Sequence, residues 1–228
     1  DLLVSHSEQK PVVIAIEDMH WIDKTSEEFL NYLIDWLPST HILLILLYRP
    51  EYSHNWGSKS YYGKISVNQL SPDNSAELVK AILEGGDVVS DLNSLIFGKA
   101  GGNPFFVEEL THSLKENGLI KIKDHQHVLN EKVSEILLPD TIQGIIAARI
   151  DRTEEKLKQI MQVASVVGRE FAYRILRAVM DMKVELKSRL SELKKLEFIS
   201  EKRLFPELEY IFKHALTQEV AYKSLLKK

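Results

Sequence analysis

Two apolar runs near the start of the chain, residues 12–16 and 42–47, limit its possible folds more than any other feature. Both runs are apolar at consecutive positions, which is typical of strands buried on both faces of a parallel sheet. Between the runs, apolar residues recur with helical spacing until Pro38 ends the segment. Because a parallel pair of strands needs a long crossover connection, usually a helix, the three segments predict a βαβ unit.

Local signals refine this first part of the chain. Thr25 and Glu28 have the spacing of a capping box, which predicts that the connecting helix begins near Thr25. Residues 65–70 predict a short third strand. The polar residues 1–10 are typical of a linker or of the end of an upstream helix.

Helical periodicity prevails after Ser71. A hairpin is expected at residues 120–129, and two short extended segments at 198–201 and 209–212. The predicted fold class is therefore α/β followed by a mostly α region. Helices are expected over residues 72–84, 89–99, 104–117, 140–150, 153–167, 171–180, 184–196 and 214–226.

Composition excludes several classes of function. The 228 residues include 29 Lys and Arg against 33 Asp and Glu, a net charge of −4 that argues against a broad surface for binding nucleic acid. There is no cysteine, which excludes disulfides, thiolate catalysis and cysteine-based zinc sites. No apolar stretch approaches the ~20 residues of a membrane span, and no signal peptide is visible. We therefore expect a cytoplasmic piece of a longer chain without a membrane partner.

The strongest chemical signal is the pair Glu17 and Asp18, directly after the first predicted strand. Ligands of open α/β sheets bind at the carboxyl ends of the strands, where two adjacent carboxylates can hold a metal ion or polarise a water molecule. The alternative is an acidic loop that only solubilises the end of the strand. The pair alone does not decide between these interpretations.

Two further signals lie at the ends of predicted elements. Arg49 follows the second strand, where a guanidinium can bind a phosphate group or form a structural ion pair with the same carboxylates. Residues 101–104 form a Gly-Gly-Asn-Pro turn between two predicted helices. Taken alone, this turn predicts only a helix–turn–helix connection.

Other candidates are weaker. Residues 98–100 resemble the end of a phosphate-binding P-loop, but Ala100 replaces the required Ser or Thr and no strand precedes them. His125 and His127 lie in the predicted hairpin without further ligands, so a solvated hairpin is favoured over a metal site. The basic stretch 183–203 permits a DNA-binding winged helix, although a helix with a solvated charged face explains it as well.

Five segments carry a resemblance to a known family: PVVIAIEDMHWID (11–23), LLYRPE (46–51), GNPFFVEEL (102–110), LPDTIQGIIAARID (138–151) and FKHALTQEVAY (212–222). In this order they resemble the STAND-class signalling ATPases, which are AAA-like modules of large bacterial regulators and also occur beside class III nucleotide cyclases or protein kinases. The first three segments resemble the Walker B region, the end of the sensor 1 strand and the Gly-x-Pro motif of that family. The last two resemble recurring blocks in and just after its winged-helix domain.

The resemblance implies roles for individual residues. Glu17 and Asp18 match the Walker B acids that hold Mg²⁺, and Asp18 matches the catalytic acid that orients the attacking water. Arg49 matches the sensor arginine that faces the γ-phosphate. Gly102, Asn103 and Pro104 match the nucleotide-binding turn, whose proline packs near the adenine. His20, Trp21 and Asp23 belong to the signature without an assigned chemical role.

The family also implies domains and partners. Residues 1–70 correspond to the C-terminal half of a parallel P-loop NTPase sheet, 71–118 to a helical lid, 119–204 to a winged-helix domain and 205–228 to the start of a helical arm. ATP or ADP with Mg²⁺ is the implied ligand, and attached signalling domains or self-association are the implied partners. The Walker A loop precedes this region in the family, so we expect ATP hydrolysis in the parent protein and little nucleotide affinity in this segment.

Two alternatives to this switch remain open. The first is a DNA-binding AAA-like protein that uses its winged helix on duplex DNA, which the overall acidity disfavours. The second is an interaction scaffold with an inactive nucleotide site.

Overall fold

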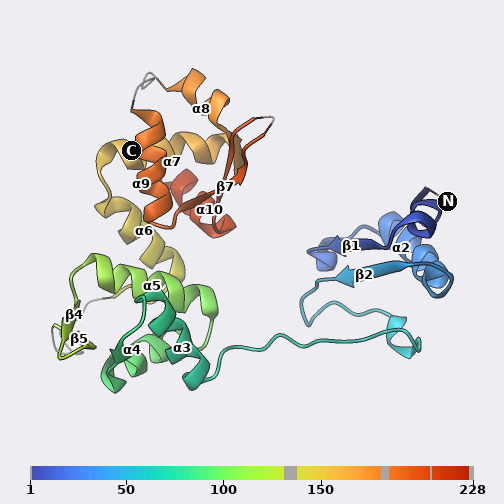
Figure 1. Ribbon diagram of the computed structural model, residues 1–228, viewed down its shortest axis with the longest axis horizontal. Helices are drawn as coiled ribbons and strands as arrows, with labels where there is room; N and C mark the ends of the chain where they lie inside the picture. The colour runs from blue at the N-terminus through green and yellow to red at the C-terminus, as the bar shows by residue number, and fades with distance from the viewer. Residues whose placement is uncertain (1, 131–137, 181–184, 206, 226–228) are drawn as a thin grey trace. The chain divides into compact units, whose positions relative to one another are not determined.

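The computed structural model describes residues 2–130, 138–180, 185–205 and 207–225 (Figure 1). The chain divides into two compact units, Asp1–Val67 and Asn68–Lys228. Among the described residues, no helix combines the length and the apolarity that crossing a bilayer would require.

The first unit contains the predicted βαβ arrangement. Strands β1 and β2 pair in parallel, with Val12 opposite Ile42 and Ile16 opposite Leu46. The prediction of two neighbouring parallel strands joined by a helix is therefore confirmed. The elements of this unit are α1 (Leu2–Gln9), β1 (Val12–Ile16), a 3₁₀ turn (Met19–Trp21), α2 (Lys24–Trp36), a 3₁₀ turn (Leu37–Ser39), β2 (Ile42–Leu46) and a 3₁₀ turn (Trp56–Ser58).

One face of this two-stranded sheet forms the core of the first unit. Ile14 and Leu44 pack with the buried side chains of α2, among them Leu30. On the opposite face, Val13 is 64% exposed and Leu43 is 58% exposed. The expectation that both strands are buried on both faces is thus wrong for this unit, because α2 covers only one face of the sheet.

The start of α2 differs from the prediction. The Asp23 carboxylate, rather than the Thr25 hydroxyl, caps the helix: its Oδ1 accepts hydrogen bonds from the backbone N–H groups of Thr25 and Ser26, both at 3.0 Å. The Ser26 hydroxyl also donates to Oδ2 at 2.6 Å. These hydrogen bonds, the one from the Ser26 side chain foremost, lower the pKa of Asp23. The capping-box prediction therefore placed the N-cap two residues too late.

The expected third strand at residues 65–70 does not form. The backbone there has no regular structure, and the side chains of Ile65 and Val67 are exposed. At the end of this stretch, the Leu70 N–H donates to the carbonyl of Gly102 at 2.8 Å. The Leu70 N–H is therefore bonded to the turn between α4 and α5 and not to a neighbouring strand.

The second unit is mainly helical and contains two small sheets, with strand orders β3-β5-β4 and β6-β8-β7. The expected hairpin is present as the antiparallel pair of β4 and β5. Two very short strands, β3 and β6, were not predicted, because two or three residues are too few to show alternation. The elements are α3 (Pro72–Ile82), β3 (Asp87–Val88), α4 (Ser90–Ala100), α5 (Pro104–Glu116), β4 (Ile120–Lys123), β5 (Gln126–Leu129), α6 (Ile142–Arg152), α7 (Glu155–Val167), β6 (Glu170–Ala172), α8 (Tyr173–Val179), α9 (Leu186–Lys195), β7 (Ile199–Arg203), β8 (Glu209–Phe212) and α10 (Ala215–Leu225).

Two apolar clusters form the core of the second unit. One joins helices α3, α4 and α5 to Ile145 of α6. The other gathers around Ile160, Leu190 and Phe212 from α7, α9 and the second sheet. Helix α6 contributes to both clusters and so connects them. The predicted helices at 184–196 and 214–226 are present as α9 and α10, and their outermost predicted residues, 184 and 226, lie outside the described residues.

Candidate functional site

The acidic pair predicted from sequence lies at the carboxyl end of β1. Glu17 and Asp18 follow the strand directly, and both are exposed. The Leu47 N–H donates to the carbonyl of Ile16 at 2.9 Å, and the Met19 N–H donates to the carbonyl of Leu47 at 3.1 Å. These two bonds keep the acidic pair beside the residues that follow β2.

Asp18 has an unusual backbone conformation, with φ of 55° and ψ of 35°. A non-glycine residue with this left-handed geometry is uncommon and carries conformational strain, and such residues cluster at functional sites. The Asp18 side chain makes no capping hydrogen bond to the 3₁₀ turn that it precedes. Its carboxylate is therefore exposed at the end of the sheet and is not used as a helix cap.

Arg49 lies at the same end of the sheet as the acidic pair. Its guanidinium carbon is 5.9 Å from the ring centroid of Trp21, which belongs to the 3₁₀ turn after Asp18. Within the described part of the chain, Arg49 forms no ion pair. The structural ion pair with the neighbouring carboxylates, which the sequence left open, is thus not formed, and the guanidinium is free to bind an anion.

His20 belongs to the 3₁₀ turn after Asp18 and has no hydrogen-bond partner in the described structure. Both of its ring nitrogens are buried without one, and its ring lies 4.7 Å from that of Trp21. Unpaired buried nitrogens are costly, so they indicate a site that another group completes. The sequence analysis gave His20 and Trp21 no chemical role.

The Gly-Gly-Asn-Pro turn lies in the second unit, between α4 and α5. Gly102 has a φ of +78°, and a Cβ atom there would lie 2.4 Å from the carbonyl oxygen of Leu70, so no larger residue fits. The Asn103 side chain caps α5 by accepting a hydrogen bond from the Phe106 N–H at 3.0 Å. Pro104 is the first residue of α5, where its fixed φ favours the helix.

The structure thus brings three predicted residues, Glu17, Asp18 and Arg49, to one end of the first unit's sheet. The turn containing Gly102, Asn103 and Pro104 belongs to the second unit, where all three have local structural roles. Carboxylate oxygens are the ligands that Mg²⁺ prefers, and a free guanidinium suits a phosphate. The nucleotide-binding and metal-binding roles of all six residues remain predictions.

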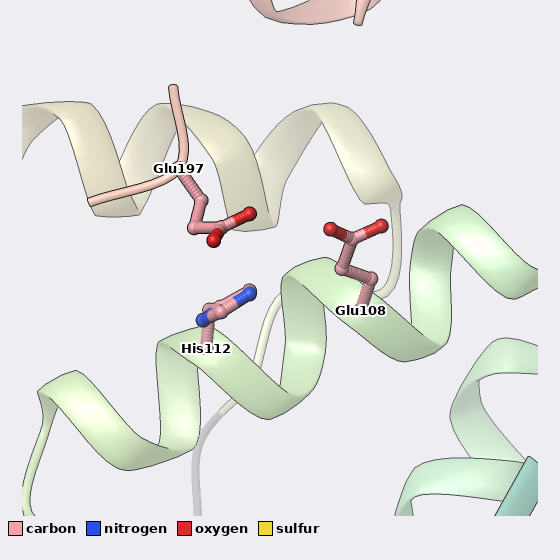
Figure 2. Close-up of side chains that lie close together, drawn as sticks. All are labelled: Glu108, His112 and Glu197. Atoms are coloured by element: carbon pink, nitrogen blue, oxygen red, sulfur yellow. The ribbon is translucent and has the colours of Figure 1, made fainter. Parts of the chain in front are cut away.

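A second group of ionisable side chains, which the sequence analysis did not identify, lies on α5. Glu108 and His112 are four residues apart on one face of the helix, and both point toward Glu197, which follows α9 (Figure 2). One potential ligand atom from each of the three side chains lies within 4.8 Å of the other two. These residues line a hollow of about 520 Å³. Only the spacing of Glu108 and His112 was visible in the sequence, because tertiary folding brings Glu197 to them.

Lys213 contributes a positive charge to this cluster. Its ammonium group donates to Glu108 at 2.5 Å and also to Glu197. Burial is the largest single influence and raises the pKa of Glu108, but the hydrogen bond and charge of Lys213, together with the charges of His214 and His112, lower the pKa overall. The pKa of His112 is lowered mainly by burial, which favours the neutral imidazole.

A buried arginine lies next to this cluster. The side chain of Arg149 in α6 is fully buried, and its guanidinium donates to Glu109 at 2.7 Å and to Glu116 at 3.0 Å, both on α5. It also donates to the carbonyl of Leu196, the residue after α9, at 2.9 Å. One side chain therefore ties α5 and α6 to the end of α9.

The weaker candidates have structural explanations. His127 is buried, and its Nε2 lies 2.8 Å from the carbonyl oxygen of Gly85, whereas His125 is exposed in the turn of the hairpin. Several cations of the basic stretch are paired with carboxylates, which is typical of a solvated charged face. These ion pairs are Arg189 with Glu154, Lys194 with Glu201 and Lys202 with Glu170.

Two sequence comparisons match this chain. Residues 71–127 match a family model described as a domain of unknown function, DUF8739. Over 225 residues the chain is 25% identical to the uncharacterized protein R02095 of Rhizobium meliloti (strain 1021). The aligned region covers 96% of this chain and 21% of that protein. The chain therefore spans about a fifth of the length of this curated relative.

The fold is also similar to a crystal structure from Pyrococcus horikoshii. That protein is a Signal Transduction ATPase with Numerous Domains (STAND) protein with a tetratricopeptide repeat sensor. The match has a TM-score of 0.60 at 14% sequence identity and covers 98% of this chain and 29% of the other. The chain thus has a mixed α/β, STAND-like fold.

Proposed function

We propose that this chain is part of an ATP-binding regulatory switch of the STAND and AAA type, which controls an attached signalling effector such as a nucleotide cyclase or a kinase. The observation that carries the proposal is the grouping of Glu17, Asp18 and Arg49 at the carboxyl end of a parallel strand pair, where α/β proteins bind their ligands. The STAND-like fold of the chain supports it.

In this proposal each of the three side chains has a separate role in ATP hydrolysis. Glu17 holds Mg²⁺, and Asp18 orients the water that attacks the γ-phosphate. Arg49 stabilises the charge that develops on the transferred phosphoryl group. The Asp18 carboxylate makes no capping hydrogen bond to the 3₁₀ turn that follows it, which supports its role by leaving it available to a ligand.

The second unit supplies the switch in this proposal. Residues 71–118 act as the helical lid that carries the Gly-x-Pro turn, 119–204 as a winged-helix domain and 205–228 as the start of a helical arm. ATP and ADP stabilise different arrangements of lid and core, and this difference in affinity sets the population of each state. The output is a contact with an effector domain or with another copy of the protein.

The test is ATP turnover by the full-length protein. Asp18→Asn keeps the shape of the side chain and tolerates the left-handed backbone, but it cannot orient water as a carboxylate does. We expect turnover to fall by about 100-fold or more, the contribution of a positioned acid–base group, while Mg-ATP still binds. Glu28→Gln, an exposed acid on α2 of the same unit, is the matched control. Equal turnover in the Asp18 variant and the parent protein would refute the role of Asp18.

ATP binding, ATP turnover and DNA binding by the full-length protein distinguish the alternatives. A scaffold with an inactive site would neither bind ATP saturably nor turn it over. A DNA-binding protein would bind double-stranded DNA with an affinity that falls steeply as the salt concentration rises. The carboxylate partners of Arg189, Lys194 and Lys202 do not favour the DNA alternative.

A further inference from the structure

The cluster on α5 has the composition of a site for a transition-metal ion. It offers two carboxylates and one imidazole, a donor set that binds Zn²⁺ and related divalent ions and leaves a coordination position open. Glu108 and His112 project from one face of α5, and Glu197 faces them from the turn after α9 (Figure 2). Three ligands from two separate segments therefore meet in one hollow of the second unit.

His112 is the residue whose surroundings most favour a metal. It makes no hydrogen bond within the described part of the chain, although it lies between two carboxylates that could accept one. Its ring nitrogens are not among the buried polar atoms that lack a partner, and the residue lines the hollow. The lone pair of the His112 imidazole therefore remains available to a ligand, and Lys213, which is only a donor, does not use it.

The two carboxylates of the cluster have cationic and imidazole neighbours besides His112. The ammonium group of Lys213 contacts both Glu108 and Glu197, and His214 Nε2 lies 3.6 Å from Glu108. Lys195 also lines the hollow. A divalent ion would match the two carboxylates. It would also compete with the Lys213 ammonium, since both cations use the same carboxylates.

We propose that Glu108, His112 and Glu197 form a binding site for Zn²⁺ or a similar first-row divalent ion, and that Lys213 competes with the metal for the two carboxylates. Metal binding displaces the ammonium group of Lys213 into the solvent-filled hollow. The bound ion then ties α5 to the turn between α9 and β7. The site lies in the second unit and does not depend on the proposed ATP-binding function.

The test is a titration of the metal-free chain with Zn²⁺ by calorimetry, and with Co²⁺ by visible absorption, which reports the ligands directly. We expect one saturable site per chain. His112→Ala and Glu197→Gln should each weaken binding by about tenfold or more, and Lys213→Met should strengthen it by a similar factor. His125→Ala removes an exposed histidine of the same unit and should leave the affinity unchanged.

Three results would overturn the proposal. The first is the absence of saturable binding in both the parent chain and Lys213→Met. The second is binding that neither His112→Ala nor Glu197→Gln weakens, which would show that the metal binds elsewhere on the surface. The third is an affinity that Lys213→Met leaves unchanged, which would exclude competition by the lysine. Far-UV circular dichroism of each variant establishes that it is folded, and Glu197→Gln keeps the test valid if His112→Ala does not fold.

Discussion

At the residue scale, Asp18 lies where the sequence predicted, at the end of an apolar strand, but it has a left-handed backbone that the sequence did not predict. Its position at the end of an apolar strand was visible in the sequence, because the apolar run ends there and two carboxylates follow. Its left-handed backbone was not visible, since Asp is enriched in that conformation but adopts others far more often. In the structure, hydrogen bonds on either side of Asp18 join Ile16 and Met19 to Leu47, which is distant in sequence. The sequence could therefore be used to predict the position of the candidate site, but not the strained backbone of Asp18.

The strain at Asp18 makes a prediction about stability. Asp18→Gly should be at least as stable as the parent chain, because glycine adopts a φ of 55° without a steric penalty. Asp18→Ala should be less stable than Asp18→Gly by about 1 kcal/mol, the cost of a left-handed backbone in a residue with a Cβ atom. Urea denaturation followed by tryptophan fluorescence measures this in the first unit, which contains all 3 tryptophans. A glycine variant less stable than the alanine variant would contradict the assigned backbone strain.

At the scale of elements, the sequence was most informative where apolar periodicity was long. The strands β1 and β2 were predicted to within a few residues from their continuous apolar runs. The helices from α3 to α10 were predicted equally well, because their apolar residues recur with helical spacing. The strands β3 and β6 were missed because they are too short for a pattern. The start of α2 was misplaced because Asp23, Thr25 and Ser26 all have side chains that can cap a helix. Only the structure shows which of them accepts the hydrogen bonds.

The cap of α2 can be tested by substitution. Asp23→Ala should lower the melting temperature of the first unit by several degrees, because two backbone N–H groups lose their acceptor. Since the pKa of Asp23 is lowered in the folded state, the stabilisation by the cap should be present at neutral pH and lost as the pH falls through that lowered pKa. Thr25→Ala is the control, and it should have a smaller effect at every pH. If Thr25→Ala lowered the melting temperature more than Asp23→Ala does, the result would favour the capping box predicted from the sequence.

At the scale of the whole chain, the contacts that hold the second unit together could not be predicted. Sequence periodicity identified α5, α6 and α9 but gave no sign that Arg149 joins them, because its partners Glu109, Glu116 and Leu196 are distant in sequence. Arginine is rarely buried, so its residue type did not mark Arg149 as part of the core. The Glu108, His112 and Glu197 cluster was missed for the same reason.

The buried ion pair predicts how strongly this unit depends on one side chain. Arg149→Ala should destabilise the second unit by about 3–5 kcal/mol, since it leaves the buried carboxylate of Glu109 without its partner and opens a cavity among three helices. Combining Arg149→Met with Glu109→Gln should cost much less than Arg149→Ala, because the buried charge of Glu109 is removed and the remaining carboxylate of Glu116 is partly exposed to water. Arg177→Ala, at an exposed arginine of α8, should change stability by less than about 0.5 kcal/mol. Chemical denaturation followed by far-UV circular dichroism measures the free energy of unfolding of all three variants. A loss below about 1 kcal/mol in Arg149→Ala would show that the carboxylate gains water or another donor once the arginine is gone.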